Sequence, residues 1–166
     1  MATNIYLKIE TPNIKGESTD ADHAGQIEIL SWSHGVSQPT SPVRSTAGSG
    51  TVERANHQDL SFTKYADIAS TDLIKNCWAG THFAKMTFAQ YRSAGDGKTV
   101  EFLTVELEDV VISSYAIGAG GGDIPMESVS LAYGKVTYKY DPADKKTGAK
   151  AGNKPVSHDL KTNKIA

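Results

Sequence analysis

The chain has 166 residues, enough for one domain with a buried core, and its composition excludes several classes of protein. Seventeen Lys and Arg residues stand against 19 Asp and Glu residues, for a net charge of −2. Six Lys and three Asp lie in residues 141–166, so the rest of the chain is acidic, which argues against nucleic-acid binding. The lone Cys77 excludes an internal disulfide and fits folding in a reducing compartment. No apolar run approaches the length of a membrane span, so we expect no membrane insertion.

The N-terminus enters a strand pattern at once. Ile5, Leu7 and Ile9 alternate with Tyr6 and Lys8, which predicts a strand with one buried face. The apolar run of a Sec signal is absent from this segment. We therefore expect a protein that is made in the cytoplasm.

A polar loop and a second strand follow. Residues 11–25 carry Asp20, Asp22 and His23, but the pattern lacks the further ligands of a metal motif, so a solvated loop is favoured. Residues 26–36 predict a strand whose two faces are both partly covered.

Residues 38–56 are rich in Pro, Ser, Thr and Gly and are too long for a hairpin turn. Connections of this length without regular structure are usually functional loops or linkers. An arm that lies on a neighbouring subunit and a mobile loop are equally compatible with this composition.

The hydrophobic period changes once, in the middle of the chain. Leu60 and Phe62 alternate with polar residues as in a strand, whereas residues 71–79 have helical spacing. Ser70 suits the N-cap of this helix and Gly80 its C-terminal left-handed position. The predicted apolar face consists of Leu73, Ile74, Cys77 and Trp78. One amphipathic helix in a strand-rich chain is expected to cover an open end or side of the sheets.

Two long strands follow the helix. We expect a strand with a bulge over residues 83–92, a hairpin loop over 93–98, and a strand over 99–117 that bends near Asp109. The glycines of 118–122 lack the following helix that a phosphate loop needs, so a flexible hairpin connection is favoured.

The last predicted strand, residues 126–140, has two unlike faces. One face carries Glu127, Val129, Leu131 and Tyr133, and the other carries Ser128, Ser130, Ala132 and Gly134. A face without bulky side chains either packs closely on another backbone or forms a smooth, wettable wall. The lysine-rich tail over residues 141–166 is expected to be poorly ordered in isolation.

The sequence argues against an enzyme. The histidines at 23, 34, 57, 82 and 158 lie far apart, and Cys77 sits on an apolar helix face, where buried cysteines are usually inert, so a Cys77–His82 pair is disfavoured. We expect no catalytic residue, cofactor or metal. The patterns together predict a mainly β, single-domain antiparallel β-barrel or two-sheet barrel over residues 1–140, with one covering helix at 71–79.

Ordered blocks across most of the chain resemble one known family. The blocks are Ile5-Tyr6-Leu7-Lys8-Ile9, Gly16-Glu17-Ser18-Thr19-Asp20-Ala21-Asp22-His23, Ile29-Leu30-Ser31-Trp32-Ser33, Leu60-Ser61-Phe62-Thr63-Lys64-Tyr65-Ala66-Asp67, Leu107-Glu108-Asp109-Val110-Val111-Ile112-Ser113-Ser114, Val129-Ser130-Leu131 and Asp159-Leu160-Lys161-Thr162-Asn163-Lys164. In this order they are similar to the Hcp (haemolysin-coregulated protein) family. The family in turn resembles phage tail-tube proteins.

The resemblance implies a structural and transport role in bacteria. Hcp proteins form six-membered rings that stack into the inner tube of the type VI secretion system. A contractile sheath expels this tube with its spike and effectors, so export to the medium or into target cells needs no Sec signal. The partners implied are other copies of the chain, the spike protein, the sheath and effector proteins.

Two groups of residues are candidates for the surfaces of such a tube. Candidates for the lumen wall are Ser31, Ser33, Ser113, Ser114, Ser128 and Ser130. Candidates for ring–ring or subunit contacts are Gln38, Arg44, Glu53, Arg54, Lys161 and Lys164. The alternative function is a monomeric small-molecule carrier, which needs an apolar pocket inside the barrel.

Overall fold

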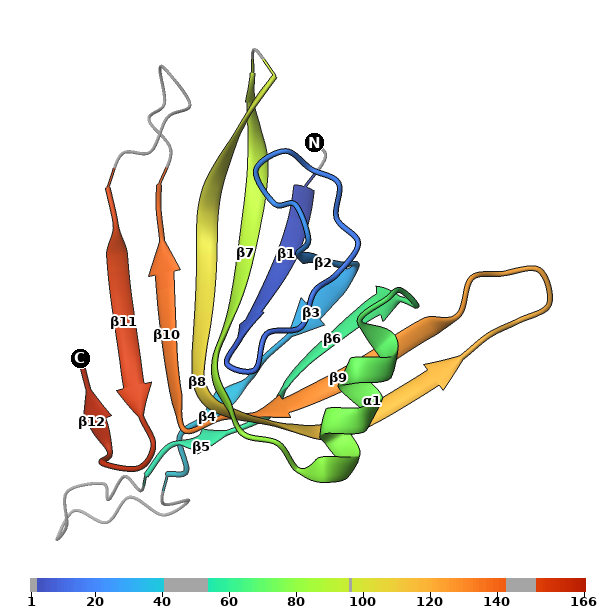
Figure 1. Cartoon of the computed structure of the whole chain (residues 1–166). Coiled ribbons are helices and arrows are strands. Elements are labelled where there is room, and N and C mark those ends of the chain that lie inside the picture. The colour runs from blue at the N-terminus through green and yellow to red at the C-terminus, as the bar shows by residue number, and fades with distance from the viewer. Residues whose placement is uncertain (1–2, 41–53, 96, 143–151) are drawn as a thin grey trace, which may run out of the picture.

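A computed structural model describes residues 3–40, 54–95, 97–142 and 152–166, and these form a mainly β structure with one helix (Figure 1). The elements in chain order are β1 (Thr3–Glu10), β2 (Ile27–Ile29), β3 (Ser31–Ser33), β4 (Val36–Ser37), β5 (Asn56–His57), β6 (Leu60–Tyr65), α1 (Ser70–Ala79), β7 (Phe83–Gly95), β8 (Lys98–Gly118), β9 (Met126–Ala132), β10 (Lys135–Tyr140), β11 (Lys154–Asp159) and β12 (Lys164–Ile165).

The strands form two sheets that share β8. The long sheet has the order β12-β11-β10-β8-β7-β1-β2, and the short sheet runs from β3 through β6 and β9 to the C-terminal half of β8. The strand pairs in both sheets are antiparallel. In the described part of the chain the strand ladder does not close into a continuous barrel, because the chain passes from β2 to β3 at Leu30. The predicted antiparallel two-sheet fold with one helix is therefore confirmed, in its open form.

β8 passes from one sheet to the other, as Figure 1 shows. Asp109, at the predicted bend, has a positive φ of 53°. Opposite it, the backbone N–H of Gly134 donates to the carbonyls of Glu108 at 2.9 Å and Asp109 at 3.2 Å. The last predicted strand, 126–140, was wrong as one element: the chain changes sheet at this point and forms β9 and β10.

The second predicted strand was also wrong as one element. Residues 26–36 contain β2, β3 and the start of β4, in three different sheets. Ile27 and Ile29 point into the core, whereas Leu30 at the sheet change is 44% exposed. The alternation of apolar and polar residues continues where a strand passes from one sheet to another. It therefore does not reveal where the chain changes its hydrogen-bonded partner strand.

The core lies between the two sheets and consists of the apolar sides of their strands. Its largest fully buried apolar side chains are Leu7, Ile9, Ile27, Leu60, Phe62, Leu73, Phe83, Met86, Phe88, Leu107 and Leu131. The rings of Phe62 and Phe88, one from each sheet, meet edge to face with centroids 5.5 Å apart. Aromatic pairs of this geometry join the sheets beyond simple burial of apolar area.

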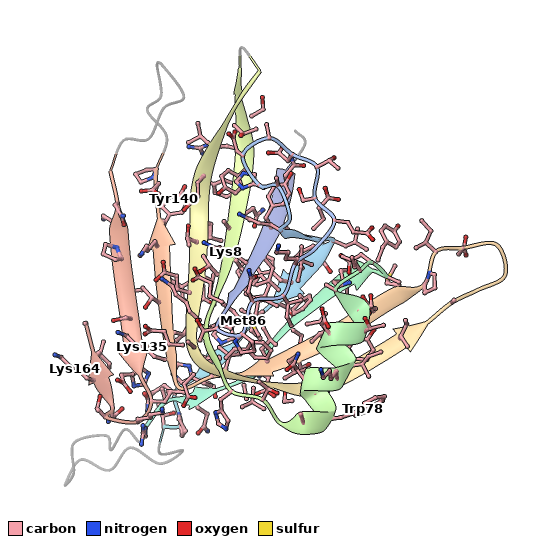
Figure 2. The ribbon with its side chains drawn as sticks, viewed as in Figure 1. Lys8, Trp78, Met86, Lys135, Tyr140 and Lys164 are labelled. Atoms are coloured by element: carbon pink, nitrogen blue, oxygen red, sulfur yellow. The ribbon has the colours of Figure 1, made fainter. Side chains whose placement is uncertain are left out.

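α1 covers one side of the sheets, where it packs against β8 (Figure 1). Leu73 is fully buried and Cys77 packs against the core, but Trp78 is 83% exposed and projects away from the body (Figure 2). Placing Trp78 on the buried face was wrong. It follows Leu73 by five residues, which rotates it about 140° around the helix.

The two ends of α1 gave different results. Gly80 has a φ of 61°, and its N–H reaches the carbonyls of the last turn, as predicted. The N-cap prediction was wrong: Ala69 occupies that position, and Ser70 is the first helical residue. The Asp67 carboxylate instead accepts from the N–H of Ala69 at 2.9 Å, and the Ser70 hydroxyl accepts from the N–H of Asp67 at 2.9 Å.

The described part of the tail, residues 152–166, lies against the long sheet. β11 pairs with β10 from Lys135↔Asp159 to Tyr140↔Lys154, and β12 pairs with β11. Backbone hydrogen bonds to β10 therefore hold this segment in place, although it has few apolar side chains. The helix found in the described residues is too short and too polar to cross a membrane.

Candidate lumenal face and contact surfaces

One face of the short sheet is covered by small hydroxyl side chains. We call this surface the hydroxyl face; it consists of Ser31, Ser33, Ser61, Thr63, Ser114, Ser128 and Ser130. The alternate residues of the same strands, among them Phe62, Val129 and Leu131, are buried in the core. The pleat of a strand sends successive side chains to opposite faces, which produces this separation.

The register aligns these hydroxyls in rows across the strands. In one row Ser31 lies opposite Thr63, which lies opposite Ser128, and the hydroxyls of Ser31 and Thr63 are 2.6 Å apart. In the second row the register runs through Ser33, Ser61, Ser130 and Ser114. The Ser61 and Ser130 hydroxyls are 2.9 Å apart. Two pairs of hydroxyls thus bond between neighbouring strands, on a face of small polar side chains.

Ser113, the sixth predicted lumenal serine, lies at a bulge in β8. The register with β9 shifts between Ile112 and Ser114, which leaves Ser113 and Ser114 both exposed. The Ser113 hydroxyl donates to the Asp59 carboxylate at 2.6 Å. The structure thus brings the predicted serines together in the short sheet, and their lumenal role stays a prediction.

Sequence reasoning did not include Ser61 and Thr63 among the candidates. Both lie in β6, the strand that joins β3 to β9. Their alternation with Leu60 and Phe62 was the available signal. The register between strands, which that alternation does not contain, is what places them between the predicted serines.

A buried ion pair lies on the core side of the same sheet. Lys64 of β6 and Glu127 of β9 are both fully buried, and the Lys64 ammonium bonds the Glu127 carboxylate. The ammonium also donates to Asp67 Oδ1 at 2.8 Å and to the Tyr65 carbonyl at 3.0 Å. The Tyr115 hydroxyl donates to Glu127 from β8. Each charge therefore has partners, as burial requires, and the cluster ties the helix N-terminus to the short sheet.

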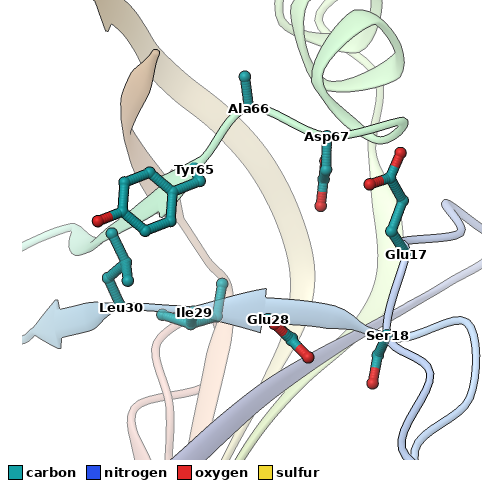
Figure 3. A pocket seen from close by; sticks show the side chains of 8 residues that line it. All are labelled: Glu17, Ser18, Glu28, Ile29, Leu30, Tyr65, Ala66 and Asp67. Carbon is teal, nitrogen blue, oxygen red and sulfur yellow. The ribbon is translucent and has the colours of Figure 1, made fainter. Parts of the chain in front are cut away.

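A polar hollow of 260 Å³ opens beside the β2–β3 junction (Figure 3). Figure 3 shows the carboxylates of Glu17 and Asp67 near one another beside the helix, and Glu28 on β2. Glu17 accepts from the N–H of Ile68 at 3.1 Å, so it joins the N-terminal loop to the start of the helix. Among the residues that the structure describes, no three His, Cys, Asp or Glu are placed to hold a metal ion.

An apolar rim lies where the β8–β9 hairpin extends from the body. Tyr65, Ile117, Ile124 and Met126 are each about half exposed, between 47% and 63%. Three of them, with the hairpin glycines, line an open hollow of 640 Å³. Exposed apolar side chains of this kind make the rim a candidate contact surface.

The predicted contact residues fall near the opposite end of the molecule. Gln38 follows β4 and Arg54 precedes β5, whereas Arg44 and Glu53 lie outside the described residues. Lys164 lies in β12, close to the β4–β5 pair, because Val36 and Ile165 line the same apolar hollow of 240 Å³.

Lys161, one of the predicted contact residues, forms an ion pair within the chain. Its ammonium pairs with the Asp109 carboxylate at the bend of β8, and this hydrogen bond, with one from His82, lowers the Asp109 pKa. His82 Nδ1 lies 3.0 Å from Asp109 Oδ1. His82, the candidate base for Cys77, is therefore paired with the Asp109 carboxylate, and Cys77 packs against the core.

Three of the five histidines lie together in the structure, which the sequence analysis did not predict. His34, His57 and His158 lie far apart in sequence, but the structure joins them through Tyr133 and Tyr138 into one hydrogen-bonded cluster. No local spacing predicts this, because the partners are about a hundred positions apart.

Comparison with known proteins identifies the family. A family model described as "Type VI secretion system effector, Hcp" matches residues 6–140. The chain belongs to the Hcp family. Protein hcp1 of Pseudomonas aeruginosa is 40% identical over 161 residues, which are 95% of this chain and 94% of that protein.

Solved Hcp structures share the fold over the whole chain. A type six secretion system protein superposes with a TM-score of 0.89 at 32% identity, covering 99% of this chain and 100% of the other. Hcp1 from Salmonella typhimurium gives 0.79 at 27% identity, with 100% of both chains covered. The predicted family and its place in type VI secretion are thus confirmed.

Proposed function

We propose that this chain is a tube subunit of a type VI secretion system, in which six copies form a ring and rings stack around a passage lined by the hydroxyl face. The observation that carries this proposal is the hydroxyl face itself, four strands wide and nearly free of bulky side chains. Such a wall is wetted by water and offers little apolar area to a passing protein, so cargo is contained without being bound strongly.

The edges of the short sheet supply a way to close the ring. In the described residues β3 pairs only with β6, and the C-terminal half of β8 pairs only with β9. Unpaired strand edges present backbone donors and acceptors to another chain. A head-to-tail contact between unlike edges repeats around an axis and closes when its rotation divides the circle. The apolar rim at Ile117, Ile124 and Met126 adds buried area to this contact.

The other end of the molecule is proposed to serve ring–ring contacts. Gln38 and Arg54, with Arg44 and Glu53 of the 38–56 segment, would meet the next ring, and Lys161 and Lys164 lie in the same region. The further partners are the spike protein, the contractile sheath and effector proteins. The chain would be made in the bacterial cytoplasm and leave the cell through the type VI apparatus rather than through Sec, and it has no catalytic role.

The carrier alternative is less well supported. A small-molecule site usually encloses about 300–1,000 Å³ of mostly apolar space. The apolar hollow beside β4 and β12 holds 240 Å³ and is open to solvent. The space between the sheets is filled by side chains such as Phe62, Phe88 and Leu107, which are at most 2% exposed.

Tryptophan insertion tests the orientation of the hydroxyl face. Ser128→Trp places a large ring at the middle of that face, and Lys8→Trp is the matched control on the exposed side of β1, labelled in Figure 2. The expected result by electron microscopy is that both variants form rings, and that only Ser128→Trp adds density inside the passage. Added density on the outer wall for Ser128→Trp would refute the lumenal assignment.

A further inference from the structure

Six polar side chains form one continuous hydrogen-bonded chain at the end of the molecule that carries β4 and β5. We call it the imidazole chain; in order it comprises Tyr138, His34, Tyr133, His57, His158 and Asn163. Its members come from the β3–β4 connection, β5, the β9–β10 connection, β10, β11 and the turn before β12. The contacts are 2.5 Å from His34 Nε2 to the Tyr133 hydroxyl and 2.8 Å from that hydroxyl to His57 Nδ1. They continue with 2.8 Å from His57 Nε2 to His158 Nδ1 and 3.0 Å from His158 Nε2 to Asn163 Oδ1.

The far end of the imidazole chain sets the direction of every bond in it. Asn163 Oδ1 only accepts, so His158 Nε2 donates and its neutral Nδ1 accepts. His57 Nε2 then donates and its Nδ1 accepts from Tyr133. By the same rule His34 Nε2 donates to the Tyr133 oxygen, and His34 Nδ1 accepts from Tyr138. Three neutral imidazoles thus satisfy all five bonds, with one donor and one acceptor each.

One added proton reverses the direction of these bonds, and a second added proton is incompatible with either direction. Protonated His158 carries an N–H at Nδ1 and forces His57 to accept at Nε2, so that His57 donates toward Tyr133. The Tyr133 hydroxyl then donates to His34 Nε2, and His34 donates from Nδ1 to Tyr138, so a single proton is accommodated by reversal of the bonds. A second proton, on His34, leaves the Tyr133 oxygen facing two donors with no acceptor for its own proton in the chain. With both His57 and His158 protonated, two N–H groups and two positive charges face each other across 2.8 Å, and the contact breaks.

The surroundings favour the neutral forms. Burial lowers the pKa of His34, and the neighbouring His57 lowers it further, whereas a hydrogen bond of the ring to the Gln58 backbone raises it by a smaller amount. Burial also lowers the pKa of His57, and His158 and the cation of Arg54 act in the same direction. Burial raises the pKa of Tyr133, with Tyr138 and Asp59 adding to it, and burial raises that of Tyr138, so both phenols keep their protons at neutral pH.

The imidazole chain attaches an element that the strand ladders leave free. β4 and β5 pair with each other as a separate two-stranded sheet, outside the long and short sheets. Isolated two-stranded pairs are marginally stable in water. This pair rests on β10 and β11 through His34 and His57 and through the apolar hollow that Val36 lines.

We propose that the imidazole chain is an acid-released latch, which holds the β4–β5 pair on β10 and β11 at neutral pH and frees it when the imidazoles become protonated below about pH 6. The sign follows from linkage. Because the folded state disfavours the protonated rings, the unfolded or released state binds more protons, and stability rises with pH. The stabilisation is complete above the ordinary histidine value near 6.5 and declines as the pH falls below it.

Hydrogen exchange on the full chain measures the release directly. The reporters are the β4–β5 amides, among them that of Gln58, which donates to the Gly35 carbonyl at 2.9 Å. From pH 7.5 to pH 5.5, after correction for the intrinsic rate of exchange, their protection is expected to fall about tenfold as protons bind the released state. The amides shared by β7 and β8 serve as the internal reference and are expected to change less than twofold.

Two variants separate the latch from general acid sensitivity. His57→Gln with His158→Gln keeps neutral donors and acceptors, and the fall in β4–β5 protection is expected to shrink to the part that His34 alone contributes. His82→Gln is the matched control, because its ring pairs with Asp109 outside the imidazole chain, and the wild-type fall is expected to remain. Carbon-13 and proton NMR titration of the wild-type imidazoles adds a readout that needs no variant, with His34 and His57 titrating below 6.5. Unchanged protection in the wild type, an equal fall in the double variant, or ordinary titration of both rings would overturn the proposal.

Discussion

At the scale of single residues, the buried pair of Lys64 and Glu127 is the most costly feature of the core. Both side chains are fully buried, and the pair joins β6 to β9 beneath the hydroxyl face. Removing charges from water costs several kcal/mol per ion, which a partner offsets only when the geometry is good. Breaking such a pair is therefore much more harmful than replacing both members.

Glu127→Gln is expected to lower the free energy of unfolding by about 3 kcal/mol, because the Lys64 ammonium stays buried with only Asp67 as an anionic partner. Urea denaturation measures the change. Glu106→Gln is the control: Glu106 pairs with Lys139 at 2.9 Å at a partly exposed position, and its loss is expected to cost about 0–1 kcal/mol.

The double change Lys64→Met with Glu127→Leu removes both charges and is expected to recover at least about 1 kcal/mol relative to Glu127→Gln. Equal losses for Glu127→Gln and Glu106→Gln would show that the buried pair is not the source of the cost.

At the scale of elements, the bend of β8 determines how the two sheets meet. Asp109 adopts a left-handed conformation with a φ of 53°, which Asp and Asn tolerate and β-branched residues do not. The bend lets one strand serve the long sheet before it and the short sheet after it. The hydroxyl face therefore depends on this backbone geometry.

Comparing Asp109→Val with Asp109→Asn isolates the backbone contribution, since both variants lose the charge that Lys161 and His82 contact. Asp109→Val is expected to be less stable than Asp109→Asn by at least about 1 kcal/mol, from the cost of a left-handed β-branched residue. Thermal or urea unfolding of the pair provides the measurement, and equal stabilities would contradict the role given to the bend.

The sequence predicted those elements whose signal is local. The period of two in β6 and β9 predicted which residues are buried, and the small face of β9 led to the candidate serines. The divisions at Leu30 and at residues 133–134 were missed because alternation continues when a strand changes sheet. β11 was missed because edge pairing of backbone needs little apolar content, and the imidazole chain because its bonds span about a hundred residues.

At the scale of the whole molecule, the short sheet is the part that we propose lines the passage of the ring. In the described residues its two outer strands, β3 and the C-terminal half of β8, lack a partner on one side, and in the proposed ring one copy pairs there with the next, so that the hydroxyl faces continue around an axis. The long sheet and α1 lie behind this wall and hold it in shape (Figure 1). The proposed acid latch lies at the opposite end of the molecule from the β8–β9 hairpin. A result that refutes the latch therefore leaves the ring proposal unchanged.

The most direct test of the central claim is the mass and shape of the purified protein in solution. Light scattering coupled to size-exclusion chromatography is expected to give six times the mass of the 17.7 kDa chain, with annular particles in negative-stain images of the same fraction. A mass of one chain at every concentration, with no annular particle in the images, would contradict the account.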